Sequence, residues 1–196
     1  KVIPAQMQFV DIAGLVSGAS KGEGLGNKFL SHIREVDAII HVVRCFENTD
    51  ITHVDNSINP LRDAETIDTE LMLADLESLE RQTQNLSKKA KSNDIDAKND
   101  LVLMRKLTEF LSDGIQLRLA NLTDVEKTRI KTFNLLTSKP VLYACNVSED
   151  DACDGNNFTR NIFDKAKTEN CDAIIISGSI ESEIAILEEI EKKEFL

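Results

Sequence analysis

The sequence predicts an α/β fold: a doubly wound, mostly parallel sheet interrupted by an α-helical coiled-coil hairpin. Two observations carry this prediction. Short, continuous apolar runs are typical of strands that are buried on both faces of a parallel sheet, and a long heptad pattern separates the second run from the third. The four runs are residues 8–12, 38–46, 141–147 and 173–177.

Helical patterns lie between or after these runs. Apolar side chains recur at helical spacing within residues 27–36, 158–168 and 180–190. Strands that alternate with helices predict a layered α/β domain. The apolar positions are Phe29, Leu30, Ile33, Phe158, Ile162, Phe163, Ala166, Ile180, Ile184, Leu187 and Ile190.

The segment between the second and third runs carries a coiled-coil seam. Its apolar positions step by four and three residues, and the spacing resumes after a polar break at residues 92–99. We expect two antiparallel helices over residues 64–111, the second ending near Gly114. A further helix should start in a capping box at Thr123 and Glu126. The seam residues are Met72, Leu76, Leu79, Thr83, Leu86, Ala90, Leu103, Leu107 and Phe110.

The net charge of −11 argues against nucleic-acid binding through a broad basic face. The acidic excess is concentrated in residues 141–196, which contain 5 basic and 13 acidic residues. We therefore expect no direct DNA binding from this segment. Any RNA contact should come from the nearly neutral hairpin or from sequence outside this chain.

The four cysteines, Cys45, Cys145, Cys153 and Cys171, show no C-x-x-C spacing. Free thiols in a reducing compartment are favoured over disulfides. No apolar stretch reaches the ~18 residues of a membrane-spanning helix, and no signal-peptide pattern is present. We expect a cytoplasmic protein without membrane contact.

The histidines offer no metal-site pattern such as H-E-x-x-H, and the chain has no G-x-S-x-G nucleophile motif. His41 falls within the second apolar run, so we expect a core residue there.

A D-x-x-G motif, Asp11 to Gly14, follows the first apolar run. In P-loop NTPases such a motif senses the γ-phosphate: the Asp holds Mg²⁺ through its water shell, and the Gly N–H approaches the phosphate. The competing interpretation is a simple strand-to-loop turn. The glycine-rich stretch that follows, residues 15–26, favours a nucleotide-dependent switch. Its glycine spacing does not match the dinucleotide fingerprint G-x-G-x-x-G.

Two further motifs end the third and fourth runs. Asn146 and Glu149 form an N-x-x-acid pattern that can read a purine, and Ser177–Gly178 suits backbone contacts to a base. Compared with the guanine-reading N-K-x-D, Val147 replaces the Lys and Glu149 replaces the Asp, so guanine selectivity should be weakened. Either motif alone is also compatible with an ordinary strand end. Their common position at the carboxyl edge of the sheet favours a nucleotide site.

Three segments resemble the YchF subfamily of Obg-like ATPases, in the translation-factor class of P-loop GTPases. They read FVDIAGLVSGASKGEGLGNKFLSHIREVDAIIHVVRCFE, NPLRDAETIDTELMLADLESLE and KPVLYACNVSED. The resemblance implies a G domain interrupted by a coiled-coil hairpin and followed by a TGS domain. It also implies a purine-nucleotide hydrolase that prefers ATP to GTP, uses Mg²⁺ and associates with the ribosome.

The same resemblance assigns parts of the chain and single residues. Residues 1–62 are expected to form the first part of the G domain with its switch II region. Residues 63–132 form the helical insertion, and residues 133–196 the base-recognition part. The expected site residues are Asp11 and Gly14 for the γ-phosphate switch, Asp11 for Mg²⁺ through water, and Asn146, Val147, Glu149, Ser177 and Gly178 for the base.

Several family features are missing from the sequence. Leu15 stands where many GTPases place a water-orienting Gln, so intrinsic hydrolysis should be slow. There is no G-x-x-x-x-G-K-[ST] and no switch I Thr, and both are expected upstream of Lys1 in a longer protein. We expect hydrolysis in that intact protein and an inactive isolated segment. The alternative is a non-catalytic module that binds the ribosome or another protein.

Overall fold

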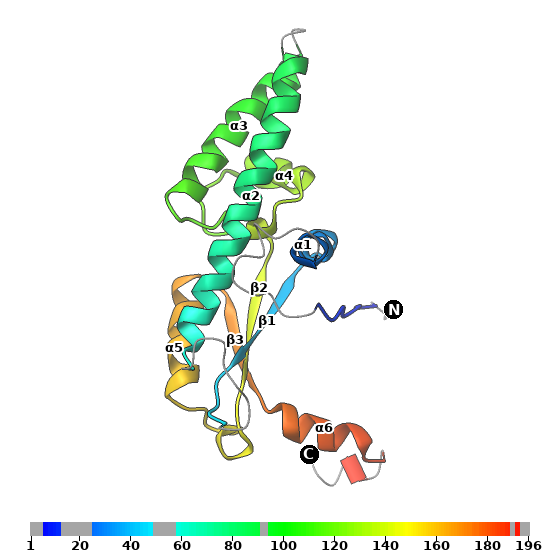
Figure 1. Cartoon of the computed structure of the whole chain (residues 1–196), viewed down its shortest axis with the longest axis vertical. Coiled ribbons are helices and arrows are strands. Elements are labelled where there is room, and N and C mark those ends of the chain that lie inside the picture. Colours follow the sequence, from blue (N-terminus) through cyan, green and yellow to red (C-terminus); the bar gives the residue numbers. More distant parts are fainter. Residues whose placement is uncertain (1–5, 13–24, 49–57, 91–93, 189–190, 193–196) are drawn as a thin grey trace.

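The computed structural model describes residues 6–12, 25–48, 58–90, 94–188 and 191–192 (Figure 1). The helices and strands follow one another in an order that places the two long helices between the first strand and the second. They are α1 (Leu25–Glu35), β1 (Ile39–Arg44), α2 (Pro60–Ala90), α3 (Ile95–Ser112), α4 (Asp124–Ile130), β2 (Val141–Asn146), α5 (Asn157–Thr168), β3 (Asp172–Ile176) and α6 (Gly178–Ile186). Short 3₁₀ turns lie at η1 (Lys131–Phe133), η2 (Leu136–Ser138) and η3 (Glu149–Asp151).

The three strands form a parallel sheet in the order β1-β2-β3. Val43 lies opposite Cys145, which in turn lies opposite Ile175, so the side chains of these residues share one face. That face packs in a core cluster with Ile162 and Ala166 of α5 and Ala64 of α2. The predicted α/β class with a parallel sheet is confirmed.

The strand predicted at residues 8–12 is wrong. Residues 6–12 have no strand hydrogen bonding, and Met7, Phe9 and Val10 are exposed at 77%, 72% and 50%. A strand needs a neighbour that satisfies its backbone N–H and C=O groups. In the part of the chain that the structure describes, no strand pairs with the outer edge of β1. Apolar character alone therefore does not make residues 8–12 a strand.

Seven of the nine predicted seam residues of α2 and α3 gather in one core; Thr83 is not among them, and the side chain of Ala90 lies outside the described part of the structure. The two helices lie side by side and run in opposite directions (Figure 1). Leu79 and Leu107 are fully buried, and Ile130 and Phe133 from the α4–η1 segment close the same core. The remaining members are Met72, Leu76, Leu86, Leu103, Met104, Phe110, Leu111, Leu117, Ala120, Leu122 and Leu135.

Both predicted helix boundaries are confirmed. α3 ends at Ser112, and Gly114 adopts a positive φ of 76°, which is a backbone conformation that glycine adopts without strain. At α4, the Thr123 hydroxyl accepts from the N–H of Glu126 at 3.3 Å, and the Glu126 carboxylate accepts from the N–H of Thr123 at 2.8 Å. This reciprocal pair is the capping box.

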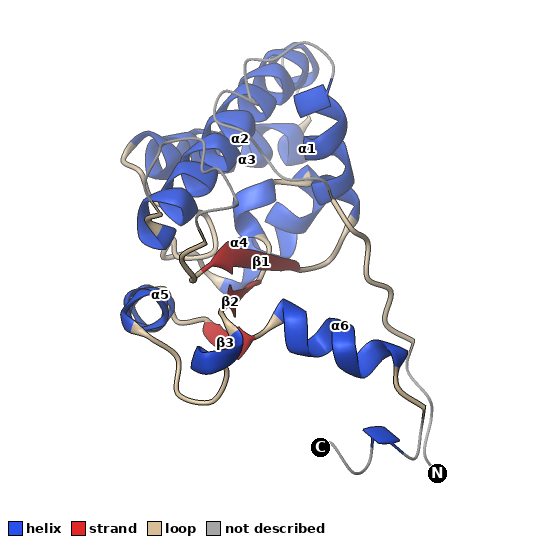
Figure 2. Cartoon of the chain, turned by 60° about the horizontal axis from the view of Figure 1, so that its bottom comes forward, coloured by secondary structure: helices blue, strands red, loops and turns tan. Residues whose placement is uncertain are grey.

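α2 is a single helix of 31 residues, about 46 Å long at the usual ~1.5 Å rise per residue. Its first half packs on the sheet layer through Ala64 and Leu71, and its second half packs in the hairpin through Leu79 and Leu86. Figure 2 shows the helical layer on one side of the strands and α6 extending away from them. One continuous helix thus belongs to both parts of the fold.

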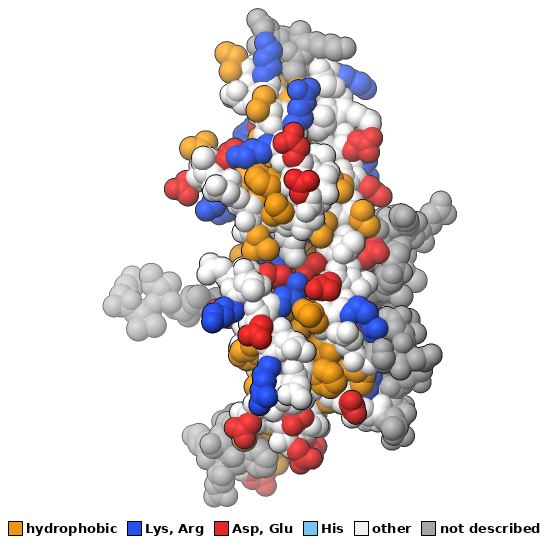
Figure 3. All heavy atoms as spheres, turned by 90° about the vertical axis from the view of Figure 1, so that its left-hand side faces the viewer, with side chains coloured by type: hydrophobic (Ala, Val, Ile, Leu, Met, Phe, Trp, Pro, Cys, Tyr) orange, Lys and Arg blue, Asp and Glu red, His pale blue; other side chains and the backbone are white. Residues whose placement is uncertain are grey.

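None of the described helices combines the length and the apolar character that a membrane crossing requires. On the surface seen in Figure 3, Lys and Arg side chains alternate with Asp and Glu side chains, and no broad face of one sign is visible there.

Candidate functional site at the carboxyl edge of the sheet

The structure brings two of the predicted base-reading motifs into direct contact. The side-chain oxygen Oδ1 of Asn146, at the end of β2, accepts a 2.9 Å hydrogen bond from the backbone N–H of Gly178. Gly178 follows β3, the neighbouring strand, and begins α6. A Cβ at position 178 would lie 3.3 Å from Asn146 Oδ1. The close approach therefore favours a residue without a side chain.

Two further predicted site residues lie near these two along the chain: Ser177 directly precedes Gly178, and Glu149 follows Asn146 by three residues. Ser177 is 5% exposed, and its hydroxyl lies 3.1 Å from that of Ser179. Glu149 is exposed at the start of η3. The edge thus offers a buried hydroxyl on Ser177, an exposed hydroxyl on Ser179 and an exposed carboxylate on Glu149.

Val147 is placed differently from the other predicted base contacts. Its side chain is 3% exposed and belongs to the core cluster on the α2/α5 side of the sheet, while its N–H donates to the Ile176 carbonyl at 2.9 Å. Any role for Val147 at a base would therefore involve its backbone atoms.

The residues predicted to sense the γ-phosphate are only partly described. Asp11 is exposed in the extended segment before α1, and Gly14 and Leu15 lie outside the described residues. Among the described residues, no three His, Cys, Asp or Glu side chains converge to hold a metal ion. Mg²⁺ at nucleotide sites uses one or two carboxylates together with water and phosphate oxygens. A single exposed Asp11 fits that water-mediated role.

Asn156 is a positioning residue that the sequence analysis missed. Its Oδ1 accepts from the N–H groups of Phe158 and Thr159 and so caps α5. Its Nδ2 donates to the Asp151 carboxylate at 2.7 Å and to the Cys45 carbonyl at 2.8 Å. The pattern Asn156-x-x-Thr159 resembles a capping box and signalled the cap. The two bonds of Nδ2 fasten the 148–151 loop, which carries Glu149, to the end of β1.

A second polar cluster lies where α2 and the segment after α3 meet α5 and β2. Glu169 accepts from Arg118 at 2.7 Å, from Lys165 at 2.6 Å and from the Tyr143 hydroxyl at 3.0 Å. Asp68 of α2 pairs with Lys165 at 2.9 Å, and the two carboxylate side chains are each 8% exposed. The cluster joins α2, the segment after α3, α5 and β2.

In this cluster, burial and ion pairing shift the pKa of Glu169 in opposite directions. Burial raises the pKa of Glu169, but the bonds from Lys165 and Arg118 outweigh it, so the pKa lies below the ordinary value. His41, stacked on Tyr143 with a ring separation of 5.5 Å, has a lowered pKa because burial disfavours its charged form. His41 is half-buried and belongs to none of the core clusters, so the predicted core position is met only in part, and its neutral form is favoured.

Comparisons with known proteins show similarity in sequence along the whole chain. A family model described as "50S ribosome-binding GTPase" matches residues 1–75. The chain is 52% identical over 196 residues to the ribosome-binding ATPase YchF of Pasteurella multocida and 50% identical over 196 residues to that of Haemophilus influenzae. It is 48% identical over 198 residues to that of Bacillus subtilis. Each match covers the whole chain and 54% of the relative, so the chain spans about half the length of these curated relatives.

A solved structure gives the same result. The structure of the Schizosaccharomyces pombe YchF GTPase superposes on 93% of the chain with a TM-score of 0.76 and 34% sequence identity, and 51% of that protein is covered. The parallel sheet and its carboxyl-edge motifs, together with sequence identity near 50% along the entire chain, agree on one family. Over the half of their length that it covers, the chain is similar to the YchF proteins along its entire sequence and in its fold.

Proposed function

We propose that this chain forms the base-recognition part and the switch II part of a purine-nucleotide hydrolase that prefers ATP to GTP and binds the ribosome. The observation that carries the proposal is the hydrogen bond between Asn146 Oδ1 and Gly178 N. It joins two motifs that are 32 residues apart, at the sheet edge where open α/β folds bind their ligands.

The chemistry of the edge suits a purine. With Oδ1 of Asn146 bonded to Gly178, the Nδ2 group has no partner among the described residues, so it is available to donate to a ring nitrogen of the base. The exposed Glu149 carboxylate can accept from an amino or ring N–H group. The N-V-S-E sequence differs from the guanine-reading N-K-x-D at two positions, and a site whose donors and acceptors no longer match guanine loses selectivity for it.

The phosphate part of the site rests on Asp11 and Gly14. Asp11 would hold Mg²⁺ through water, and the bound ion would neutralise charge on the phosphates. Gly14 would place its N–H near the γ-phosphate. Leu15 cannot orient an attacking water, so hydrolysis should be slow unless another group supplies that function. The names of the relatives include both ATPase and GTPase, which supports nucleotide hydrolysis as the common activity.

The ribosome is the proposed macromolecular partner, and the cytoplasm is the proposed location. The curated relatives are named ribosome-binding ATPases. The protruding hairpin, residues 63–132 in the proposed domain division, is nearly neutral, whereas residues 141–196 are strongly acidic. Repulsion from RNA phosphates is therefore weaker at the hairpin than at residues 141–196. A non-catalytic interaction module is the second candidate, because no phosphate-binding G-x-x-x-x-G-K-[ST] occurs within the sequence.

The proposal is tested by nucleotide binding to the full-length gene product. A fluorescent ATP analogue is titrated against the wild type, Asn146→Ala and the matched control Asn99→Ala, which alters an exposed residue of α3. Asn146→Ala should weaken binding about tenfold or more, since a polar group of the site is left unpaired. Asn99→Ala should bind as the wild type does. Absence of nucleotide binding in the wild type would favour the interaction module.

A further inference from the structure

We propose that Arg34 is a positioning residue that couples α1 to the helical hairpin, so that a nucleotide-dependent movement of α1 is transmitted to α2. This inference rests on the proposed function. α1 directly follows the glycine-rich segment that the sequence identifies as a candidate switch, and Arg34 lies in its last turn.

The first step is the reach of the Arg34 guanidinium. Nη1 donates to the Asn134 carbonyl at 2.8 Å, and Nη2 donates to the Ala74 carbonyl at 3.4 Å. Nη1 also lies 3.5 Å from Oδ1 of Asp75. These three partners, Asn134, Ala74 and Asp75, are 100, 40 and 41 residues away along the chain. One planar side chain therefore touches α2 and the segment that returns from the hairpin to β2, and its fixed fork of donors suits such a junction.

The second step is the environment of Asp75. Its side chain is completely buried, and it accepts three hydrogen bonds of 2.8 Å, from the N–H of Leu136, the N–H of Thr137 and the Thr137 hydroxyl. Arg34 thus contacts a carboxylate that already fixes the returning segment to α2. A buried carboxylate with this many donors is rigidly placed, because each lost bond would leave an unpaired polar group.

The third step is a contact from the returning segment to the main chain at the end of α1. Lys139, just before β2, donates from Nζ to the Arg34 carbonyl at 3.1 Å and to the Val36 carbonyl. Arg34 therefore holds the returning segment with its side chain, and that segment holds Arg34 by its main chain. A shift of the end of α1 cannot occur without a shift of the segment or the loss of bonds on both sides.

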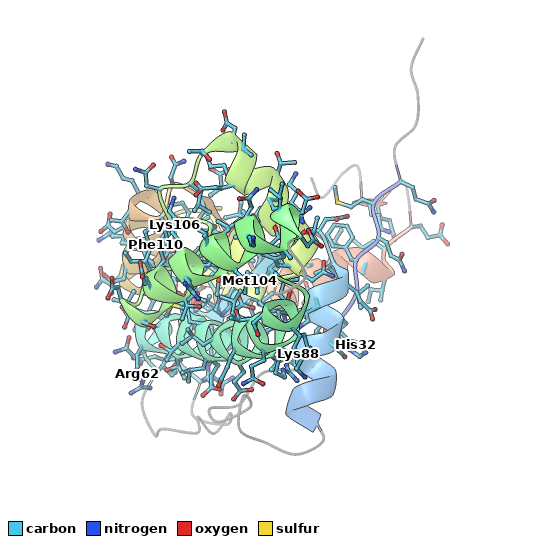
Figure 4. The ribbon with its side chains drawn as sticks, turned by 90° about the horizontal axis from the view of Figure 1, so that it is seen from above. His32, Arg62, Lys88, Met104, Lys106 and Phe110 are labelled. Atoms are coloured by element: carbon cyan, nitrogen blue, oxygen red, sulfur yellow. The ribbon has the colours of Figure 1, made fainter. Side chains whose placement is uncertain are left out.

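The fourth step is the apolar packing beneath these polar contacts. Leu30 and Ile33 of α1 share a core cluster with Leu71 and Ala74 of α2 and with Leu136. Viewed from above, α1, which carries the labelled His32, lies next to α2, which carries the labelled Arg62 and Lys88 (Figure 4). Packed interfaces of this kind shift between discrete arrangements and do not deform continuously. α1 and the first half of α2 should therefore respond as a unit.

The hairpin also offers a control that matches the Arg34 contacts. Arg129 of α4 forms a bidentate pair with Asp100 of α3, with both bonds at 2.6 Å. This pair fastens α4 to α3, and both of its residues belong to the hairpin. Its removal tests whether loss of any hairpin ion pair produces the effect.

The test is hydrogen exchange in the full-length gene product with and without a non-hydrolysable ATP analogue. In the wild type and in Arg129→Ala, the nucleotide should change the amide protection of both α1 and α2, by about fivefold or more for α2, the lower range of allosteric coupling. In Arg34→Ala the change in α2 should be lost while the change in α1 remains. Arg34→Lys, which keeps the charge and some donors, should recover part of it. Direct titration of the analogue should show unchanged binding.

Two results would overturn the coupling and leave the nucleotide site intact: a nucleotide effect on α2 in Arg34→Ala equal to that of the wild type, or no effect on α2 in the wild type despite nucleotide binding. An equal loss in Arg129→Ala would also overturn it, since the effect would then reflect a general loosening of the hairpin. Failure of the wild type to bind nucleotide would instead overturn the proposed function, together with the coupling that rests on it.

Discussion

Asn146 and Gly178 meet across two neighbouring strands, with the amide oxygen of one 2.9 Å from the backbone nitrogen of the other. This contact fixes the orientation of the Asn146 amide plane. Because Nδ2 lies in the same plane, its direction is fixed as well. It also explains why a residue without a Cβ suits position 178, because a Cβ would lie 3.3 Å from Oδ1. A substitution of Gly178 should therefore affect nucleotide binding and the stability of the fold differently.

Gly178→Ala should weaken nucleotide binding to the full-length protein several-fold without destabilising the fold. The added methyl group crowds Asn146 Oδ1, whereas Ala is a better helix former than Gly at the start of α6. Analogue titration and urea unfolding measure the two effects. Ser182→Ala, one turn further along α6, is the control for changes in the helix itself. Equal affinities of Gly178→Ala and the wild type would mean that the Asn146 side chain does not take part in binding.

Asp75→Ala should destabilise the protein by about 3 kcal/mol or more. The substitution leaves three buried donors from Leu136 and Thr137 without an acceptor, and an unsatisfied buried polar group costs about 1–3 kcal/mol. Asp75→Asn should be milder, since one acceptor oxygen remains. Urea unfolding measures the difference, with the exposed Asp96→Ala as the control. A change below about 1 kcal/mol in Asp75→Ala would contradict the role given to this carboxylate.

Acid should destabilise the protein through His41. The pKa of His41 in the folded protein lies below the ordinary 6.5. Below about pH 6.5 the unfolded chain therefore binds more protons than the folded protein, and the free energy of unfolding decreases as the pH is lowered. The groups around His41 are Asp68, Glu169, Lys165 and Arg118.

His41→Phe should flatten the stability curve between about pH 6.5 and pH 5 relative to the wild type. Comparison of the two proteins cancels other groups, such as Asp75, whose pKa burial raises and whose contribution has the opposite sign. Glu169, whose pKa is lowered, adds a loss of stability only below its ordinary value of 4.5. Denaturant unfolding across this range gives the slopes. Parallel curves for wild type and His41→Phe would show that His41 does not titrate differently on folding.

The cysteines should react with a thiol reagent in an order set by burial. Cys153 is exposed and should be labelled first, Cys171 is half-buried and should follow, and Cys45 and Cys145 are buried and should react only on unfolding. Mass spectrometry of peptides after timed labelling measures the order. Early labelling of Cys145 in the folded protein would contradict the packing of the sheet core.

The sequence contained the information for most of this fold where the pattern is local. The heptad spacing of Leu79 and Leu107 predicts the hairpin core, and Thr123 and Glu126 predict the start of α4. Residues 8–12 show the limit of this reasoning. They have the composition of a strand, but strand formation depends on a neighbouring strand, which composition does not reveal.

The polar contacts that fix the hairpin could not be predicted, because they join residues that are far apart along the chain. Asp75 is one of seven acidic residues on α2, and nothing in its spacing distinguishes it from exposed ones such as Glu80. The role of Arg34 depends on carbonyl groups 40 and 100 residues away. The edge motifs were predictable because carboxyl ends of parallel strands meet at one edge. The direct bond between Asn146 and Gly178 was not.

The most direct test of the proposed function is a side-by-side calorimetric titration of the full-length gene product with Mg-ATP and Mg-GTP. The site built around Asn146, Glu149 and Gly178 predicts tighter binding of ATP. The isolated 196-residue chain, whose sequence has no G-x-x-x-x-G-K-[ST], should bind neither nucleotide measurably. Equal affinities, or tighter binding of GTP, would contradict the proposed base recognition.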